Sequence, residues 1–409
     1  MTTPHSVHRP DRVTEIHIRG LRTLQDVRLK LGPLTVLIGE NGAGKSSVAE
    51  ACALLGKLGS ETFREHFMSA HGGFTSLLRR GSEAIELGLR LEGNGDPLEY
   101  GIELTSEGGQ LIITSEWLAV WNQKPTPTKV FWRLRNKASI RNPTGKDSDE
   151  VTLDEGRPLV SGFGVLPSQP AITRLLEALR NIEVHVPFTT TSSWAARALS
   201  VQSPTRQSAV IAPADRLAFG GANLANAFHA LRNDKPHEHW RQTMEYVRLG
   251  LGTDVESIDS RVDPGGGQIA LALRRRGVGQ PEPAFSLSDG MLSYLAFVAL
   301  FRLEAPTSLL VFDEPEVHLH PSLLGRVLGF FDAISEHTSV LLCTHSDRLL
   351  DGLSDPAGSA ALIELDEHRG ASIVRPDGPA LEEWLKKYSG LGSLRADGYE
   401  PIVFPPEPA

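Results

Sequence analysis

A nine-residue segment near the amino terminus, Gly39 to Ser47, constrains this chain more than any other feature. It fits the phosphate-binding pattern G-x-x-x-x-G-K-[ST] at every fixed position. Residues 34–38 before it form a short apolar run typical of a buried strand, and the Ala- and Leu-rich residues 48–58 after it indicate a helix. This context predicts a loop that cradles nucleotide phosphates. The residues expected to contact the nucleotide are Gly39, Glu40, Asn41, Gly42, Ala43, Gly44, Lys45, Ser46 and Ser47.

The chemistry of phosphate binding explains these residue types. Small residues let successive backbone N–H groups wrap around the β- and γ-phosphates at the positive end of the following helix. The ammonium of Lys45 would reach the outer phosphates, and the hydroxyl of Ser46 would bind Mg²⁺. The alternative is a glycine-rich turn with a chance lysine, which the flanking strand and helix patterns disfavour. We therefore expect ATP and Mg²⁺ as ligands.

Composition places the chain among globular proteins and limits its partners. Its 409 residues are 40% hydrophobic and 22% charged, enough for one large domain or two ordinary ones. The net charge of −9 argues against general affinity for nucleic acid but allows a local basic patch. The two cysteines, Cys52 and Cys343, provide neither a disulfide framework nor a metal site. No run approaches the length of a membrane span and no secretory segment is evident, so we expect a cytoplasmic protein without membrane contact.

Periodicity predicts an α/β fold in which strands precede the phosphate loop. Residues 13–19 and 24–31 alternate as half-buried strands that lead into it. Between residues 84 and 135, four alternating runs separated by turn residues predict antiparallel strands. The Ser- and Thr-rich stretch 189–208 is the segment we expect to be mobile. The predicted units are an N-terminal lobe with the phosphate loop and an antiparallel β lobe (1–140), a helical insertion (141–284) and a C-terminal lobe (285–409).

A second chemical signal follows the apolar run 309–312, where a strand ends in two adjacent carboxylates. Asp313 is placed to bind Mg²⁺, directly or through water, and Glu314 to activate the water that attacks the γ-phosphate. Many strands end in acidic residues, so this pair alone is weak evidence. A phosphate loop in the same chain makes it strong, and we predict Lys45, Glu314 and His345 as the catalytic residues.

Two further spacings resemble those of the ATP-binding-cassette ATPases. Residues 287–291, Leu-Ser-Asp-Gly-Met, stand where that superfamily has its signature sequence, and His345 stands where it has a histidine that senses the γ-phosphate. The resemblance implies that Ser288 and Gly290 contact the nucleotide of a second protomer in a head-to-tail homodimer, and that the loop 316–320 crosses the interface. Without that spacing, Ser288 would be interpreted as a helix N-cap.

More narrowly, the chain resembles the RecF, SMC and OLD-like group, and within it the stand-alone bacterial predicted ATPases of the AAA domain 21 type. Asp313 to Pro321 resembles the wider group, and the features shared with the AAA domain 21 type include Gly221 to Ala225, Leu287 to Gly290 and Trp384 to Gly392. No membrane segment accompanies the long separation between Lys45 and Asp313, which disfavours a transporter subunit. Because no Asp-x-Asp pair follows His345, we expect no Toprim nuclease domain. A glutamine corresponding to the Q-loop of the superfamily is not evident.

The resemblance implies an ATPase that forms ADP and phosphate and acts as an ATP-driven dimer switch, in DNA repair or in defence against phage and plasmids. The alternative is a slow-turnover ATP-binding scaffold for a separately encoded nuclease or toxin effector. Arginine runs at 274–276 and 79–80 leave contact with DNA open, since such runs are more often solvated surface. His318, His320 and His345 are better explained by the motifs above than by a dedicated metal centre.

Overall fold

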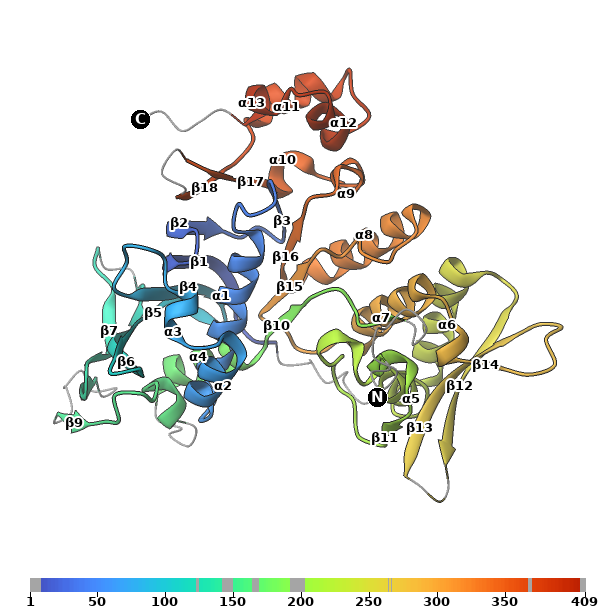
Figure 1. Cartoon of the computed structure of the whole chain (residues 1–409), viewed down its shortest axis with the longest axis horizontal. Helices are drawn as coiled ribbons and strands as arrows, with labels where there is room; N and C mark the ends of the chain where they lie inside the picture. The colour runs from blue at the N-terminus through green and yellow to red at the C-terminus, as the bar shows by residue number, and fades with distance from the viewer. Residues whose placement is uncertain are drawn as a thin grey trace.

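The computed structural model describes residues 9–122, 125–141, 150–163, 169–191, 203–263, 265, 267–366 and 370–404 (Figure 1). A central sheet separates an antiparallel β lobe from a helical lobe, and the C-terminal helices lie at one end of it. Within the described ranges, no helix combines the length and apolar character needed to cross a bilayer.

The central sheet has six strands and positions the phosphate loop. Its first five strands pair in parallel and the sixth is antiparallel, because β17 and β18 form a hairpin. The run 34–38 expected to form a strand is β3, at the middle of the sheet. In spatial order, the strands are β10 (Ile182–His185), β15 (Leu309–Asp313), β16 (Ser339–Thr344), β3 (Leu34–Ile38), β17 (Ala360–Leu365) and β18 (Ala371–Val374).

Alternate residues of these strands supply two hydrophobic cores, one on each face of the sheet. Leu37, Val311 and Leu341 belong to the core shared with the β lobe. Their chain neighbours Phe312 and Leu342 belong to the core shared with the helical lobe. A strand covered on both faces must be apolar at every position, which explains the continuous apolar runs.

The β lobe is an eight-stranded antiparallel sheet, which confirms the antiparallel strands expected between residues 84 and 135. Its inner face packs against α1 (Lys45–Lys57) and α4 (Pro170–Arg180), and α2 (Phe63–His71) and α3 (Phe74–Leu77) lie beside it. In spatial order, its strands are β2 (Leu24–Lys30), β1 (Arg12–Leu21), β4 (Ile85–Gly93), β5 (Gly95–Glu107), β6 (Gln110–Val120), β7 (Thr128–Leu134), β8 (Lys137–Ile140) and β9 (Val151–Thr152).

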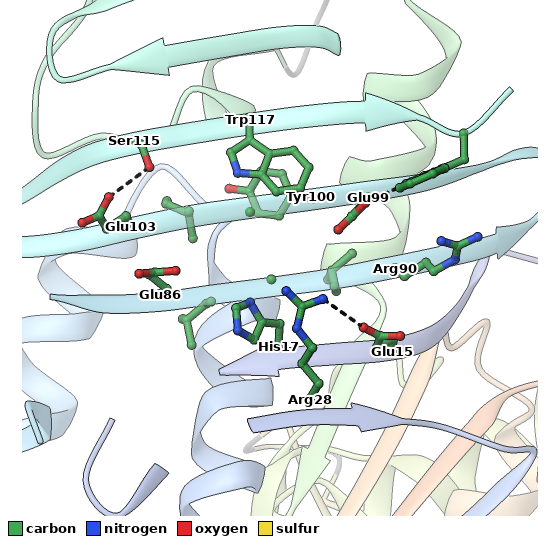
Figure 2. A pocket seen from close by; sticks show the side chains of 16 residues that line it. Glu15, His17, Arg28, Glu86, Arg90, Glu99, Tyr100, Glu103, Ser115 and Trp117 are labelled. Atoms are coloured by element: carbon green, nitrogen blue, oxygen red, sulfur yellow. Dashed lines mark hydrogen bonds and ion pairs between the residues drawn. The ribbon is translucent and has the colours of Figure 1, made fainter. Parts of the chain in front are cut away.

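The outer face of the β lobe carries a hollow of about 460 Å³ over β1, β4, β5 and β6 (Figure 2). At its centre Gly88 pairs with Gly101, which in turn pairs with Trp117. The Trp117 indole lies across Gly101, where an added Cβ would come within 2.8 Å of the ring. Gly101 is therefore needed to make room for the indole, and Gly88 leaves the space beside it open.

The helical lobe contains four long helices and a small antiparallel sheet. In this small sheet, β12 (Val255–Asp263) pairs antiparallel with β13 (Gln268–Arg275). The helices are α5 (Leu224–Asn233), α6 (His237–Leu251), α7 (Asp289–Leu303) and α8 (Pro321–Ser335). The small strands are β11 (Ala209–Val210), β12 (Val255–Asp263), β13 (Gln268–Arg275) and β14 (Glu282–Pro283).

The segment expected as an insertion, 141–284, contributes to more than one part of the fold. Its α4 packs against α1, and its β10 pairs in parallel with β15 in the central sheet. The remainder forms most of the helical lobe, so the boundaries at 140 and 284 stay a prediction. Much of the stretch expected to be mobile, residues 192–202, lies outside the described residues.

Glu116 is a fully buried carboxylate that ties β6 to the chain after β9. It accepts hydrogen bonds from the backbone N–H groups of Leu159 (2.6 Å) and Val160 (3.0 Å) and from the hydroxyl of Tyr100 (3.0 Å). The Arg133 guanidinium lies 3.8 Å away. Burial raises the pKa of Glu116, and these partners oppose the shift. Removal of the carboxylate would leave two buried N–H groups without their acceptor and the buried Arg133 guanidinium without its counter-charge.

We therefore expect Glu116→Ala to lower the free energy of unfolding by about 3 kcal/mol, measured by urea denaturation. Glu103→Ala is the matched control, because Glu103 lies on the half-exposed outer face of the same sheet and accepts one bond from Ser115. Glu103→Ala should lower the free energy of unfolding by less than about 0.5 kcal/mol. Equal losses for the two variants would contradict a structural role for the Glu116 network.

Candidate active site

The phosphate loop lies between β3 and α1, as the motif predicted. Gly42 and Gly44 have positive φ values of 84° and 119°, which residues with a side chain rarely adopt. Gly39 packs against the chain at Ile363, where an added Cβ would overlap the carbonyl oxygen. A Cβ at Gly44 would come within 2.7 Å of the Thr23 hydroxyl oxygen. These glycines are therefore required both by backbone conformation and by close packing.

Lys45 is the first residue of α1 and is almost completely buried. Its ammonium donates hydrogen bonds to the carbonyl oxygens of Gly39 (2.7 Å) and Glu40 (2.9 Å). Burial lowers the pKa of Lys45, and the nearby carboxylates of Asp313 and Glu314 oppose the shift. The ammonium is thus held across the mouth of the loop by neutral acceptors, which phosphate oxygens can replace with stronger, charge-assisted bonds.

Asp313 is the last residue of β15 and faces the start of α1. Its Oδ1 is buried and has no hydrogen-bond partner. Burial raises the pKa of Asp313, and a hydrogen bond from the Ser46 hydroxyl partly offsets the rise. An orphaned carboxylate oxygen beside a hydroxyl fits Mg²⁺, which binds to proteins through one or two oxygen ligands and completes its shell with water and phosphate. Asp313 and Ser46 are the residues that would hold the ion, which would neutralise phosphate charge when bound.

Glu314 follows in a left-handed backbone conformation with φ of 51°, which is uncommon for a non-glycine residue. Its N–H donates to the Cys343 carbonyl oxygen at 2.7 Å, so the turn is fastened to the neighbouring strand β16. The carboxylate lies 3.2 Å from Nδ1 of His345, the residue that follows β16. The structure therefore brings Lys45, Ser46, Asp313, Glu314 and His345 to one edge of the sheet.

Sequence analysis missed the part played by Glu316. Its Oε1 accepts a 2.6 Å hydrogen bond from the Thr344 hydroxyl, whereas its Oε2 is buried without a partner. Burial raises the pKa of Glu316, and the bond from Thr344 opposes the rise. This bond joins the loop after Glu314 to the residue before His345. In sequence, Glu316 was recognised only as the first residue of the loop 316–320, which the resemblance places at a dimer interface, and nothing there indicated its bond to Thr344.

The signature segment forms the start of α7, as its interpretation as a phosphate clamp requires. The Ser288 hydroxyl accepts a hydrogen bond from the Met291 N–H at 3.2 Å, so it is also the helix N-cap. Gly290 lies against the loop after β15, where an added Cβ would be 2.9 Å from the His318 carbonyl oxygen. Among the described residues, no hydrogen bond or ion pair joins Ser288 or Gly290 to the phosphate loop of the same chain.

A buried arginine that the sequence did not single out shapes this segment. The Arg206 guanidinium donates to the carbonyl oxygens of Phe285 (3.0 Å) and Leu287 (2.6 Å) and to the Asp289 carboxylate (2.5 Å). Its Nε donates to the Thr190 carbonyl oxygen at 2.5 Å. Arg206 therefore presents Ser288 by holding the residues on both sides of it. It lies at the edge of the expected mobile stretch, far from any motif in sequence.

Several histidines and arginines outside the predicted site pair with residues of their own chain. His320 caps α8 through Nδ1 and Ser322. Arg22 pairs with Glu50 of α1 at 2.7 Å. In the basic run of β13, Arg274 pairs with Asp259 at 3.0 Å and Arg275 with Asp254 at 2.8 Å. Within the part of the chain that the structure describes, no three His, Cys, Asp or Glu side chains are grouped to hold a metal ion.

Comparison with known proteins gives one family and one fold. A family model described as "AAA domain, putative AbiEii toxin, Type IV TA system" matches residues 34–351. A solved SMC head bound to the C-winged helix domain of ScpA is similar, with a TM-score of 0.52, 14% identity, and coverage of 92% of this chain and 99% of that chain. At this identity the likeness shows a shared fold.

Two other SMC heads are more distant in structure. One, from Thermotoga maritima, has a TM-score of 0.44 and 14% identity, covering 89% of this chain and 98% of that chain. The other, derived from Pyrococcus furiosus, carries an extended coiled coil and is bound to the C-terminal domain of ScpA. It has a TM-score of 0.49 and 12% identity, covering 92% of this chain and 99% of that chain. No curated protein matches this chain.

The unpartnered Asp313 oxygen leads to a prediction about stability. Because burial raises the pKa of Asp313 in the folded chain, the ligand-free fold loses stability as the pH rises from the usual pKa of an aspartate to this raised pKa, and the loss is complete above it. We expect Asp313→Asn to raise the melting temperature of the ligand-free protein by a few degrees at about pH 8. The gain should disappear at a pH low enough to protonate Asp313.

The measurement is thermal unfolding across pH without nucleotide, with the exposed Asp234→Asn as control. In the wild type, ATP with Mg²⁺ should raise the melting temperature, and Asp313→Asn should lose most of this rise. A pH-independent effect of Asp313→Asn, or an unchanged response to ATP with Mg²⁺, would contradict the assignment of Asp313 as a metal ligand.

Proposed function

The chain belongs to the AAA domain family whose model matches residues 34–351, and from this premise we propose that it hydrolyses ATP to ADP and phosphate as a head-to-tail homodimer. ATP would close the dimer and hydrolysis would open it. Mg²⁺ would accompany the nucleotide.

The observation that carries the proposal is the meeting of the loop and strand-end residues at one sheet edge. Lys45 would contact the outer phosphates, and Ser46 and Asp313 would hold the metal. Glu314 would orient and deprotonate the attacking water, because its carboxylate lies beside the metal ligand Asp313 in sequence. His345, 3.2 Å from that carboxylate, would fix its orientation and contact the γ-phosphate.

Among the described residues, no hydrogen bond or ion pair joins Ser288 to the phosphate loop of the same chain, which supports a site completed by a second copy. Ser288 is exposed, and the N-terminus of α7 has free capacity to bind an anion. Phe285, three residues before it, is 69% exposed, and Phe219 is 65% exposed. In a head-to-tail dimer each Ser288 and Gly290 would reach the nucleotide of the other protomer.

The Glu314–His345 contact also favours the second candidate function, a slow-turnover scaffold for a separately encoded effector. In the ligand-free chain this contact occupies the carboxylate that would activate water. A signal that separates the two side chains would then be needed for rapid hydrolysis. DNA repair and defence against phage or plasmids remain the proposed settings, and contact with DNA would need arginines beyond the paired Arg274 and Arg275.

The test is the solution mass of Glu314→Gln with and without ATP and Mg²⁺, measured by light scattering. The substitution keeps the shape of the side chain but removes the base, so it should trap bound ATP and double the mass from 44.4 kDa. Adding Ser288→Arg to this variant should prevent the doubling, whereas adding Lys129→Glu, on an exposed residue of β7 in the β lobe, should have a smaller effect.

Turnover by the wild type separates the two candidate functions. A rate near the usual range of about 1–100 per second supports an ATPase switch, and a rate far below it supports the scaffold. If Glu314→Gln binds ATP but keeps the same mass, the head-to-tail dimer is wrong. If no variant binds ATP, the nucleotide site itself is wrong.

A further inference from the structure

The short helix α9 (Asp347–Asp351) begins two residues after His345, so whatever holds this helix also places that histidine. The link between them is tight. The Ser346 N–H donates to the Thr344 hydroxyl at 2.9 Å, and the Ser346 hydroxyl caps α9 by accepting from the Leu349 N–H at 3.4 Å. Thr344 is itself bonded to Glu316. A displacement of α9 would therefore be passed to His345.

The C-terminal helix α12 (Leu391–Ala396) packs directly on α9, and the small residues before and within it allow close contact (Figure 1). An added Cβ at Gly392 would overlap the carbonyl oxygen of Asp347, and one at Gly390 would overlap the side chain of Asp351. The Ser393 N–H and hydroxyl both donate to the Asp351 carboxylate at 2.9 Å. The two helices are thus joined along their whole length.

Arg395 makes the charged contact of this packing. Its guanidinium donates to the Asp347 carboxylate at 2.7 Å, and its side chain is 19% exposed. Arg395 therefore links the C-terminal segment to the segment that follows His345.

We propose that Arg395 is a positioning residue of the ATPase site, which acts through Asp347 to hold the segment 344–347 and hence His345 in register with Glu314. The inference rests on the proposed ATPase function. Arg395 lies outside residues 34–351, so the family match does not cover it. The competing explanation is that the ion pair only fastens the C-terminal helices, in which case its loss would affect stability but not the chemical step.

The test compares Arg395→Ala, Arg395→Lys, Asp347→Ala and the double variant Arg395→Ala with Asp347→Ala. Arg348→Ala is the matched control, because Arg348 is an exposed residue of the same helix α9. For each variant the kcat and KM of ATP hydrolysis are measured. Hydrogen exchange of residues 344–351 is measured in the nucleotide-free protein, so that one readout does not depend on activity.

We expect Arg395→Ala to lower kcat about tenfold, because a displaced catalytic group loses alignment, with KM within about twofold of wild type. Arg395→Lys should recover part of the loss, since it keeps the charge but not the guanidinium geometry. If Arg395 acts through Asp347, the double variant should be no slower than the slower single variant. Hydrogen exchange of residues 344–351 should accelerate in Arg395→Ala, in Asp347→Ala and in the double variant, but not in Arg348→Ala.

Each outcome separates the inference from the function on which it rests. A wild type that binds no ATP and shows no turnover overturns the proposed function and the inference with it. An active wild type with unchanged kcat and exchange in Arg395→Ala overturns the inference alone. Multiplicative losses in the double variant would show that Arg395 does not act through Asp347, and equal loss in Arg348→Ala would show a general effect of α9.

Discussion

The parallel pairing of β3, β16 and β15 is the constraint on which the rest of this structure depends. Three neighbouring strands that run in the same direction end at one edge of the sheet. The residues at these strand ends are therefore brought together although they are far apart in sequence. Lys45, Asp313, Glu314 and His345 meet for this reason. A register shift of one residue between β15 and β16 would move the Glu314 N–H away from the Cys343 carbonyl that fastens its turn.

Burial on both faces keeps this pairing in place. The β lobe covers one face of the central sheet and the helical lobe covers the other, so each strand contributes to two hydrophobic cores. The site is then surrounded by buried polar groups with incomplete partners, among them Asp313 and Glu316. Such groups destabilise the ligand-free fold, and nucleotide and metal would supply the missing partners.

The motif residues could be predicted from sequence because their spacing is local. The phosphate loop is nine consecutive residues, and the strand–loop–helix pattern around it was confirmed by β3 and α1. The Asp-Glu pair and the serine at the start of α7 were also recognisable from adjacent residues. Arg206 and Arg395 could not be found in this way, because nothing near either residue in sequence marks its partner. Each acts on a segment that only chain folding brings to it.

The sequence by itself determined the chemistry of this protein: small residues, a lysine, a serine and two carboxylates that suit a nucleotide with its metal, and apolar runs that must be buried on both sides. Tertiary structure alone decided which distant residues contact these motifs and strands. It placed β10 beside β15, joined Arg206 to the residues on both sides of Ser288, and brought Arg395 to Asp347. The physical reason is that residue type and periodicity are local properties, whereas hydrogen bonds and ion pairs between distant segments depend on the path of the whole chain.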